Sequence, residues 1–185
     1  MDRIYITADL HIGHNKPFLY EPRGFTSIYD HDQALIKNWN EIITDEDDVY
    51  ILGDVMLNDI NYDVKIFNQL CGIKHIIKGN HDTSNKILRY HDLRGVVEVR
   101  DIITLEHNWY HFYMSHYPTI TSSNDVIKPL DCRVINLCGH VHTKDAFRDM
   151  NIGLIYHCEL DAHDMKPVLL DDIITDIKEY LHEDN

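Results

Sequence analysis

The sequence has no long apolar run. Across its 185 residues, no window approaches the roughly 18 apolar residues needed to span a bilayer. The N-terminal residues lead straight into strand-like sequence, without the pattern of a signal peptide. Internal repeats, low-complexity segments and linkers are also missing. We therefore expect a cytoplasmic protein with no membrane segment, built as a single domain over residues 1–185.

Basic residues are scarce. Lysine and arginine together number 17 against 31 aspartates and glutamates, so the formal net charge is -14. A surface that binds duplex nucleic acid needs clustered basic side chains against the phosphates. The excess of acidic residues therefore argues against binding to duplex nucleic acid. Bound divalent cations would offset part of the acidic charge.

The sequence also lacks closely spaced cysteine pairs. Its four cysteines are Cys71, Cys132, Cys138 and Cys158. Disulfides and cysteine-rich metal sites are therefore not indicated, and reduced thiols fit the cytoplasmic location. The apolar fraction of 44% and the charged fraction of 26% are ordinary for a globular domain with a packed core.

What the sequence does have is a set of five apolar, strand-like runs that each end in Asp, Asn or His. Solvated strand ends would draw equally on Ser, Lys, Glu and Thr. Open α/β sheets place their ligands at such strand ends, so this pattern predicts a metal site there. The five segments are Asp9-Leu10-His11, Gly53-Asp54, Gly79-Asn80-His81-Asp82, Ser115-His116 and Gly139-His140-Val141-His142.

The spacing within these segments suits shared coordination. Residues two apart in an extended chain point the same way, so Asp9 and His11 can bind one ion together, and His140 and His142 can face one site. A carboxylate has two oxygens and can bridge two cations, whereas a neutral imidazole offers one lone pair. Asp54 is therefore the candidate for a shared ligand.

The remaining pattern predicts an α/β fold, α+β in part. A strand at 49–52, a helix over about 60–70 and a strand at 73–77 form a βαβ unit with parallel pairing. Closely spaced strands within 96–114 suggest an antiparallel second sheet or edge. Asp30, with Gln33 three residues on, is the expected N-cap of an early helix.

Together, the five segments resemble the five motifs of the calcineurin-like metallophosphoesterases, in the same order and with compatible spacing. The resemblance runs from residue 5 to about 145 and is nearest to the small, compact bacterial and phage-type members. It implies a four-layer sandwich of two packed mixed β-sheets flanked by helices, with a dinuclear metal site at the strand ends.

The resemblance also implies a ligand set. One metal would be held by Asp9, His11, Asp54 and His142, and the other by Asp54, Asn80, His116 and His140. These nitrogen and oxygen ligands suit two divalent ions, with Mn expected and Fe, Ni or Zn also compatible.

The implied reaction is hydrolysis of a phosphodiester or phosphomonoester by direct attack of a metal-bridging hydroxide. His81, the one motif histidine without a metal, would be the general acid. Asp82 would either orient it or cap the following helix. His14, Arg23 and Tyr117 are candidates for substrate contact, and loops such as residues 16–26 and 117–128 would recognise the leaving group.

Two alternatives stay open. A catalytically silent scaffold of the same fold would be expected to have lost motif histidines, whereas this chain keeps them. A nuclease acting on single-stranded or short nucleic acid fits the acidic balance less well. The expected partner is a small phosphoester, with a nucleotide as one option, and the oligomeric state is open. The segment His157-Cys158-Glu159-Leu160 departs from the pattern of relatives.

Overall fold

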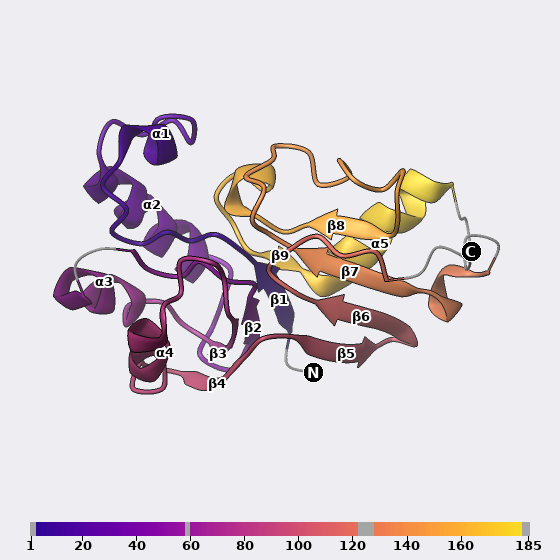
Figure 1. Cartoon of the computed structure of the whole chain (residues 1–185), viewed down its shortest axis with the longest axis horizontal. Helices are drawn as coiled ribbons and strands as arrows, with labels where there is room; N and C mark the ends of the chain where they lie inside the picture. Colours follow the sequence, from indigo (N-terminus) through magenta and orange to yellow (C-terminus); the bar gives the residue numbers. More distant parts are fainter. Residues whose placement is uncertain (1–2, 58–59, 122–127, 183–185) are drawn as a thin grey trace.

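The computed structural model describes residues 3–57, 60–121 and 128–182, and its strands form two sheets (Figure 1). The first sheet has the order β4-β3-β2-β1-β9 and the second the order β5-β6-β7-β8. The strands of the first sheet are β1 (Ile4–Thr7), β2 (Asp48–Ile51), β3 (Ile73–Ile77), β4 (Val96–Arg100) and β9 (Val168–Leu169). Those of the second are β5 (Ile103–His107), β6 (Tyr110–Met114), β7 (Val134–Cys138) and β8 (Ile155–His157).

Both sheets are mixed. In the first, β1 to β4 run parallel and β9 joins β1 antiparallel. In the second, β5 and β6 form an antiparallel hairpin, while β6, β7 and β8 pair in parallel. The expectation of two mixed β-sheets with flanking helices is confirmed.

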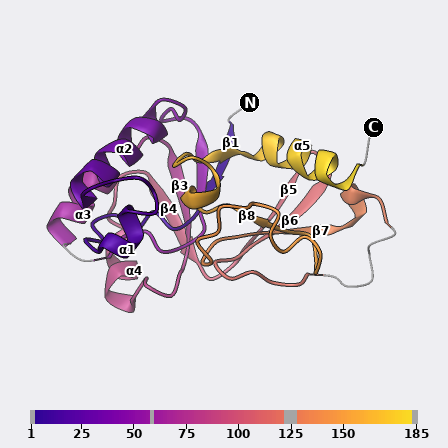
Figure 2. The ribbon, with the colours of Figure 1, turned by 90° about the horizontal axis from the view of Figure 1, so that it is seen from above.

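The helices gather around the sheets as Figure 2 shows, with α1 to α4 together at one end of the molecule and α5 beside the second sheet. The helices are α1 (Pro17–Tyr20), α2 (Ile28–Asn40), α3 (Ile60–Phe67), α4 (Ser84–Tyr90) and α5 (Leu170–Leu181), with short 3-10 helices at Leu130–Cys132 and Leu160–Ala162. None of the described helices is long and apolar enough to cross a membrane.

Two hydrophobic cores hold these layers together. One packs the outer face of the first sheet against α2 to α4, with Trp39 and Phe67 fully buried. The other joins the inner face of the first sheet to the second sheet and α5, with Ile6, Phe112 and Ile173 in its interior. Because β1 and β2 are buried on both faces, most of their residues are apolar.

Three local expectations differ from the structure. The α2 N-cap is Ser27, whose hydroxyl accepts from the Asp30 backbone N–H at 3.1 Å and donates to the Asp30 carboxylate, so Asp30 lies inside the first turn. Strand β4 joins the first sheet in parallel, so of the three strands within residues 96–114 only β5 and β6 pair antiparallel with each other. The three-residue β8 was not expected, because so short a strand has almost no periodicity.

Candidate metal centre

All five predicted segments follow the C-terminal ends of parallel strands. Asp9, Asp54 and Asn80 follow β1, β2 and β3 in the first sheet. His116 and the segment 139–142 follow β6 and β7 in the second. Backbone hydrogen bonds continue past the strands, from Asp9 N–H to the Gly53 carbonyl at 3.1 Å and from Gly139 N–H to the His116 carbonyl at 3.0 Å. The two sheets therefore bring their loops to one place.

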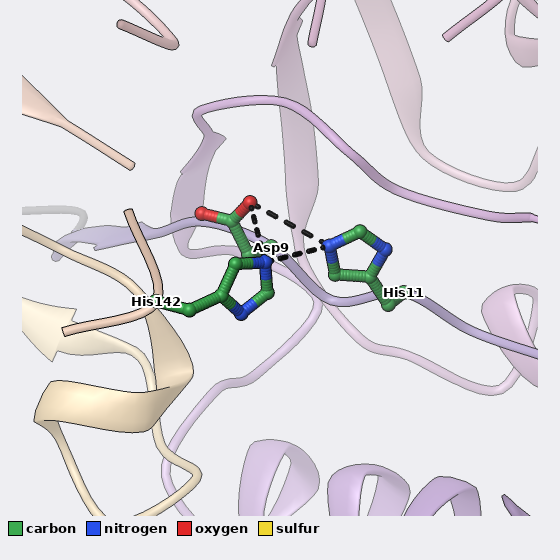
Figure 3. A group of neighbouring side chains, drawn as sticks. All are labelled: Asp9, His11 and His142. Carbon is green, nitrogen blue, oxygen red and sulfur yellow. Dashed lines mark hydrogen bonds and ion pairs between the residues drawn. The ribbon is translucent and has the colours of Figure 1, made fainter. Parts of the chain in front are cut away.

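Asp9 holds one carboxylate oxygen in place and leaves the other free. Its Oδ2 accepts from the His140 backbone N–H at 2.8 Å. Its Oδ1 is buried without a hydrogen-bond partner and lies 3.7 Å from His11 Nε2 and 3.6 Å from His142 Nε2 (Figure 3). The two Nε2 atoms are 3.1 Å apart. One carboxylate oxygen and two imidazole nitrogens thus converge on a single point.

Asp54, like Asp9, has one carboxylate oxygen held by a backbone N–H and the other surrounded by histidines. Its Oδ1 accepts from the His81 backbone N–H at 2.9 Å. Its Oδ2 lies 3.7 Å from His11 Nε2, 3.8 Å from His116 Nε2 and 3.9 Å from His81 Nε2. The side chain is 2% exposed. This oxygen is the point at which histidines from three strand ends meet.

Hydrogen bonds on the far side of the rings set which nitrogen faces inward. His116 Nδ1 lies 2.8 Å from the Leu52 carbonyl, to which only an N–H can bond, so its Nε2 carries the free lone pair. His142 Nδ1 is held 3.0 Å from the Asp161 carboxylate. His116 Nε2 in turn lies 2.9 Å from Asn80 Oδ1, which brings the amide oxygen into the same cluster.

Five of these residues take a left-handed backbone conformation, which side chains other than glycine rarely adopt. They are Asp9 (φ 57°), His11 (49°), Asp54 (54°), His140 (78°) and His142 (53°). Such residues gather at functional sites, where the surrounding structure maintains the strain. Here the left-handed conformation directs these side chains toward the cluster, from loops whose backbones are hydrogen-bonded to each other beyond the strand ends.

Two glycines of the motifs are required by close approach. A Cβ on Gly79 would overlap the Asp54 carboxylate and backbone nitrogen, and a Cβ on Gly139 would overlap the Asp9 carboxylate. In both cases the crowded group is an oxygen-bearing side chain of the cluster. The glycines therefore let the loops pack directly against the two buried aspartates.

The arrangement fits divalent metal ions. Among the described residues, two groups place ligand atoms close enough for one ion: Asp9, His11 and His142, and Asp9, Asp54 and His116. Burial raises the pKa of the Asp9 carboxyl and, together with His142, holds the pKa of His11 well below its usual range. A buried carboxylate with an unpaired oxygen beside two imidazole nitrogens is what a cation would stabilise.

His140 and Tyr117 lie on the second-sheet side of the cluster. The His140 ring is 5.0 Å from the His116 ring and 4.6 Å from the Tyr117 ring. The Tyr117 ring also meets His116 edge-on at 5.0 Å and is about half exposed. His140 is thus beside the cluster without belonging to either close group. Residues 122–127 of the predicted recognition loop lie outside the described residues.

His81 and His14 lie on the His11 side of the cluster, where His81 is exposed and His14 is buried. The His81 side chain is 46% exposed, and its ring is 5.6 Å from that of His11. The His14 ring is 5.3 Å from His11 and 6.4 Å from His81. Burial, with His81 close by, lowers the pKa of His14 to about 4, so it is neutral at pH 7. Both rings face the cluster from the loops after β1 and β3.

Asp82 braces the site through the backbone. Its carboxylate accepts from the N–H groups of Asp54 at 2.9 Å, Val55 at 3.3 Å and Gly79 at 2.8 Å, and from the Tyr90 hydroxyl. All these donors belong to the loops and helix around it, and none is the His81 ring. The side chain ties the β2 and β3 loops to α4.

Arg23 is likewise engaged within the protein. Its guanidinium, only 1% exposed, donates to Asp161 at 2.7 and 3.0 Å and to the Asp9 carbonyl at 2.9 Å. It also lies 2.9 Å from His31. Burial alone would raise the pKa of Asp161, but hydrogen bonds from His142 and Arg23 outweigh it and hold that pKa well below its usual range.

The segment after β8 supports the His140–His142 loop. Glu159 accepts from the Val141 backbone N–H at 3.2 Å, and Glu159 pairs with Ala8 in an isolated parallel bridge. Asp161 holds His142 from the next turn. Sequence reasoning noted this segment as altered and did not assign these roles. The one indication in the sequence was the pair of acidic residues, Glu159 and Asp161, which follows the predicted metal-binding segment at 139–142.

No known protein-family model matches the sequence, but individual proteins are similar to it. An uncharacterised protein of Methanocaldococcus jannaschii is 32% identical over 120 residues, which cover 64% of this chain and 60% of that protein's length. The Gene 66 protein of Mycobacterium phage D29 is 28% identical over an alignment of 202 residues, covering 98% of this chain and 100% of the phage protein.

Two solved structures share the fold. A protein of unknown function from Aquifex aeolicus superposes with a TM-score of 0.72 at 21% identity, over 95% of this chain and 99% of that one. An archaeal phosphodiesterase superposes with a TM-score of 0.50 at 18% identity, over 84% of this chain and 82% of that one. The chain therefore has the fold of the small phosphoesterases, that of the calcineurin-like metallophosphoesterases.

Proposed function

We propose that this protein is a metal-dependent phosphoesterase that hydrolyses phosphodiesters or phosphomonoesters. The observation that carries the proposal is the position of Asp54 Oδ2, 3.7 to 3.9 Å from the Nε2 atoms of three histidines. One oxygen so placed suits a ligand shared between two cations. The fold shared with an archaeal phosphodiesterase supports the same class of reaction.

The proposed ligands are those expected from the sequence. One ion would be held by Asp9, His11, Asp54 and His142, and a second by Asp54, Asn80, His116 and His140. Two bound divalent cations would lower the pKa of a water molecule, and their positive charge would stabilise the phosphate oxygens. The nitrogen and oxygen donors suit Mn, which we propose, as well as Fe, Ni or Zn.

His81 is the proposed general acid. Its side chain is 46% exposed and lies on the open side of the cluster, so it can reach the oxygen that leaves with the product. General acids of this kind typically contribute about 10²- to 10⁴-fold in rate. Asp82 would act through the backbone by fixing the loop from which His81 projects.

The other polar residues have distinct proposed roles. His14, neutral and close to His81, would donate or accept a hydrogen bond at the phosphate. Tyr117 would contact the substrate from the His140 side. Arg23 is fully engaged with Asp161 and the Asp9 carbonyl, so we propose that it holds the loops in place. Ser115 donates its hydroxyl to the Tyr117 carbonyl at 2.8 Å and is not placed as a nucleophile.

A substrate panel tests the proposal. The protein, stripped of metal with chelator and reloaded with Mn²⁺, is assayed on 4-nitrophenyl phosphate and bis(4-nitrophenyl) phosphate. We expect turnover that appears with the metal and disappears with excess chelator. Metal binding without turnover on any ester in the panel would instead support the silent scaffold. Failure to bind metal at all would overturn both.

A further inference from the structure

A cavity of about 290 Å³ opens beside the proposed metal centre and has no role in the chemistry described so far. Its lining residues are Phe18, Leu19, Pro22, His142, Lys144 and Asp161. We refer to it as the ring pocket. Because His142 belongs both to the pocket and to the cluster around Asp9, a molecule whose phosphate lies at the cluster could extend into the pocket.

The walls of the ring pocket are largely apolar. In the short helix α1, Leu19 and Tyr20 are buried at 5% and 8% exposure, whereas Phe18 is 70% exposed. The helix is therefore anchored by its neighbours, and the Phe18 ring is left facing outward. Its edge meets the His14 ring at 5.4 Å with an interplanar angle of 88°. An exposed aromatic held between a cavity and a site histidine offers a surface for stacking.

The charges at the pocket are largely satisfied. Asp161 is paired with Arg23 and His142, so its negative charge is already matched. Lys144 donates to the Pro22 carbonyl at 3.2 Å, which keeps the ammonium at the rim. An apolar cavity with one cation at its edge suits an uncharged planar ring that carries hydrogen-bond acceptors. Its volume, near the lower end for small-molecule sites, suits one ring system.

We propose that the ring pocket binds the aromatic group of a phosphoester, of the size of a phenyl ring or nucleobase, and that Phe18 stacks on it. The inference rests on the proposed function, because the phosphate of the same molecule lies at the metal ligands. It names the substrate class as esters with an aromatic group rather than simple alkyl esters. Phe18 is then a residue that determines specificity.

Binding of two phosphonates to the Mn²⁺-loaded protein, measured by calorimetry, tests this without relying on turnover. Phenylphosphonate and methylphosphonate have the same charged head and differ in the ring. We expect the wild-type protein to bind phenylphosphonate on the order of tenfold more tightly. In Phe18→Ala the preference should fall to about twofold or less, and in Phe18→Tyr it should be kept.

The matched control is Leu88→Ala. Leu88, on α4, is also 70% exposed and does not line the ring pocket. This variant should keep the full preference for the ring. Equal binding of the two phosphonates by the wild-type protein, or a preference that survives Phe18→Ala, overturns the ring pocket alone. If neither phosphonate binds while Mn²⁺ does, the proposed function fails together with it.

Discussion

At the residue scale, the centre combines buried carboxylates with strained backbone. Five of its residues have positive φ values, and each such residue costs on the order of 1–3 kcal/mol. The two aspartates each use one oxygen for a backbone N–H and leave the other among imidazoles. Both features cost folding free energy, which is expected at a functional site and not at a purely structural one.

The different roles proposed for Asp54, as a metal ligand, and His81, as the general acid, give a first prediction. Asp54→Asn should lose metal, since the charge proposed to bridge the two cations is gone, whereas His81→Ala should bind metal normally and lose about 10²-fold or more in turnover. Metal content by atomic absorption and initial rates on one ester measure the two effects. His111→Ala, a 45% exposed histidine in β6 outside the cluster, is the control. An empty site in His81→Ala would contradict the role given to His81.

Lys74 gives a second prediction, away from the centre. Its ammonium is fully buried, donates to the carbonyls of Gly72 and Arg94, and burial lowers its pKa to about 8 from 10.5. The folded state therefore disfavours the charged form. The Lys74 contribution to the free energy of unfolding should be lowest below pH 8 and rise between pH 8 and 10.5.

Urea unfolding of the wild type and Lys74→Met at pH 7.5, 8.5 and 9.5 measures this contribution. The stability of the wild type relative to the variant should increase by about 1 kcal/mol per pH unit in this range. Tyrosine and cysteine ionisations are common to both proteins and cancel in the difference. A difference that does not vary with pH would show that Lys74 has an ordinary pKa in the folded state.

At the scale of elements, the centre depends on how closely the strand-end loops approach one another. Gly79→Ala should lower the free energy of unfolding by about 1–3 kcal/mol and weaken metal binding, because the added Cβ overlaps the Asp54 carboxylate and backbone. Urea unfolding in chelator and metal titration measure the two changes. Gly153→Ala, where the nearest atom to the Cβ is 3.6 Å away, should have little effect. Equal stability of the two variants would contradict the close approach.

The turn after β8 carries a further prediction, on Asp161. Asp161→Asn removes the charge opposite the buried Arg23 and weakens the bond that orients His142. We expect a loss of about 3–5 kcal/mol in stability and about 10- to 100-fold in metal affinity. Asp101→Asn, which breaks an ion pair with Lys78 at an 81% exposed carboxylate, should cost under about 1 kcal/mol. A loss no larger than that of the control would show that the Arg23 pair is not needed.

At the scale of the whole molecule, the two sheets meet at the proposed metal centre, so bound metal should stabilise the fold. Mn²⁺ at about 100 times its dissociation constant should add roughly 2.7 kcal/mol, which corresponds to a rise in Tm of about 5–10 °C for a chain of this length. Thermal scans with Mn²⁺ and with chelator measure the shift. Asp54→Asn should show a much smaller one. An unchanged Tm in the wild type would count against a metal centre that joins the sheets.

Short stretches of the sequence were enough to predict a large part of the fold and of the site. The apolar runs and the polar residues at their ends are properties of short stretches. The spacing of Asp9 and His11 was interpreted as extended chain, whereas both residues have a left-handed backbone, with φ of 57° and 49°. The apolar runs and their polar ends predicted the βαβ unit and the residues that gather at one edge, whereas the two mixed sheets were implied by the family resemblance. The glycines at 79 and 139 also stood in the sequence, although the atoms that require them did not.

The contacts between distant side chains could not be predicted from such stretches. Arg23 and Asp161 are 138 residues apart, and no local pattern joins them. The same holds for the Glu159 support of the His140–His142 loop, for Asp82 turning to backbone N–H groups rather than to His81, and for the ring pocket between α1 and Lys144. Such partners depend on the packing of both sheets, because side-chain contacts between distant segments arise only when the whole chain has folded.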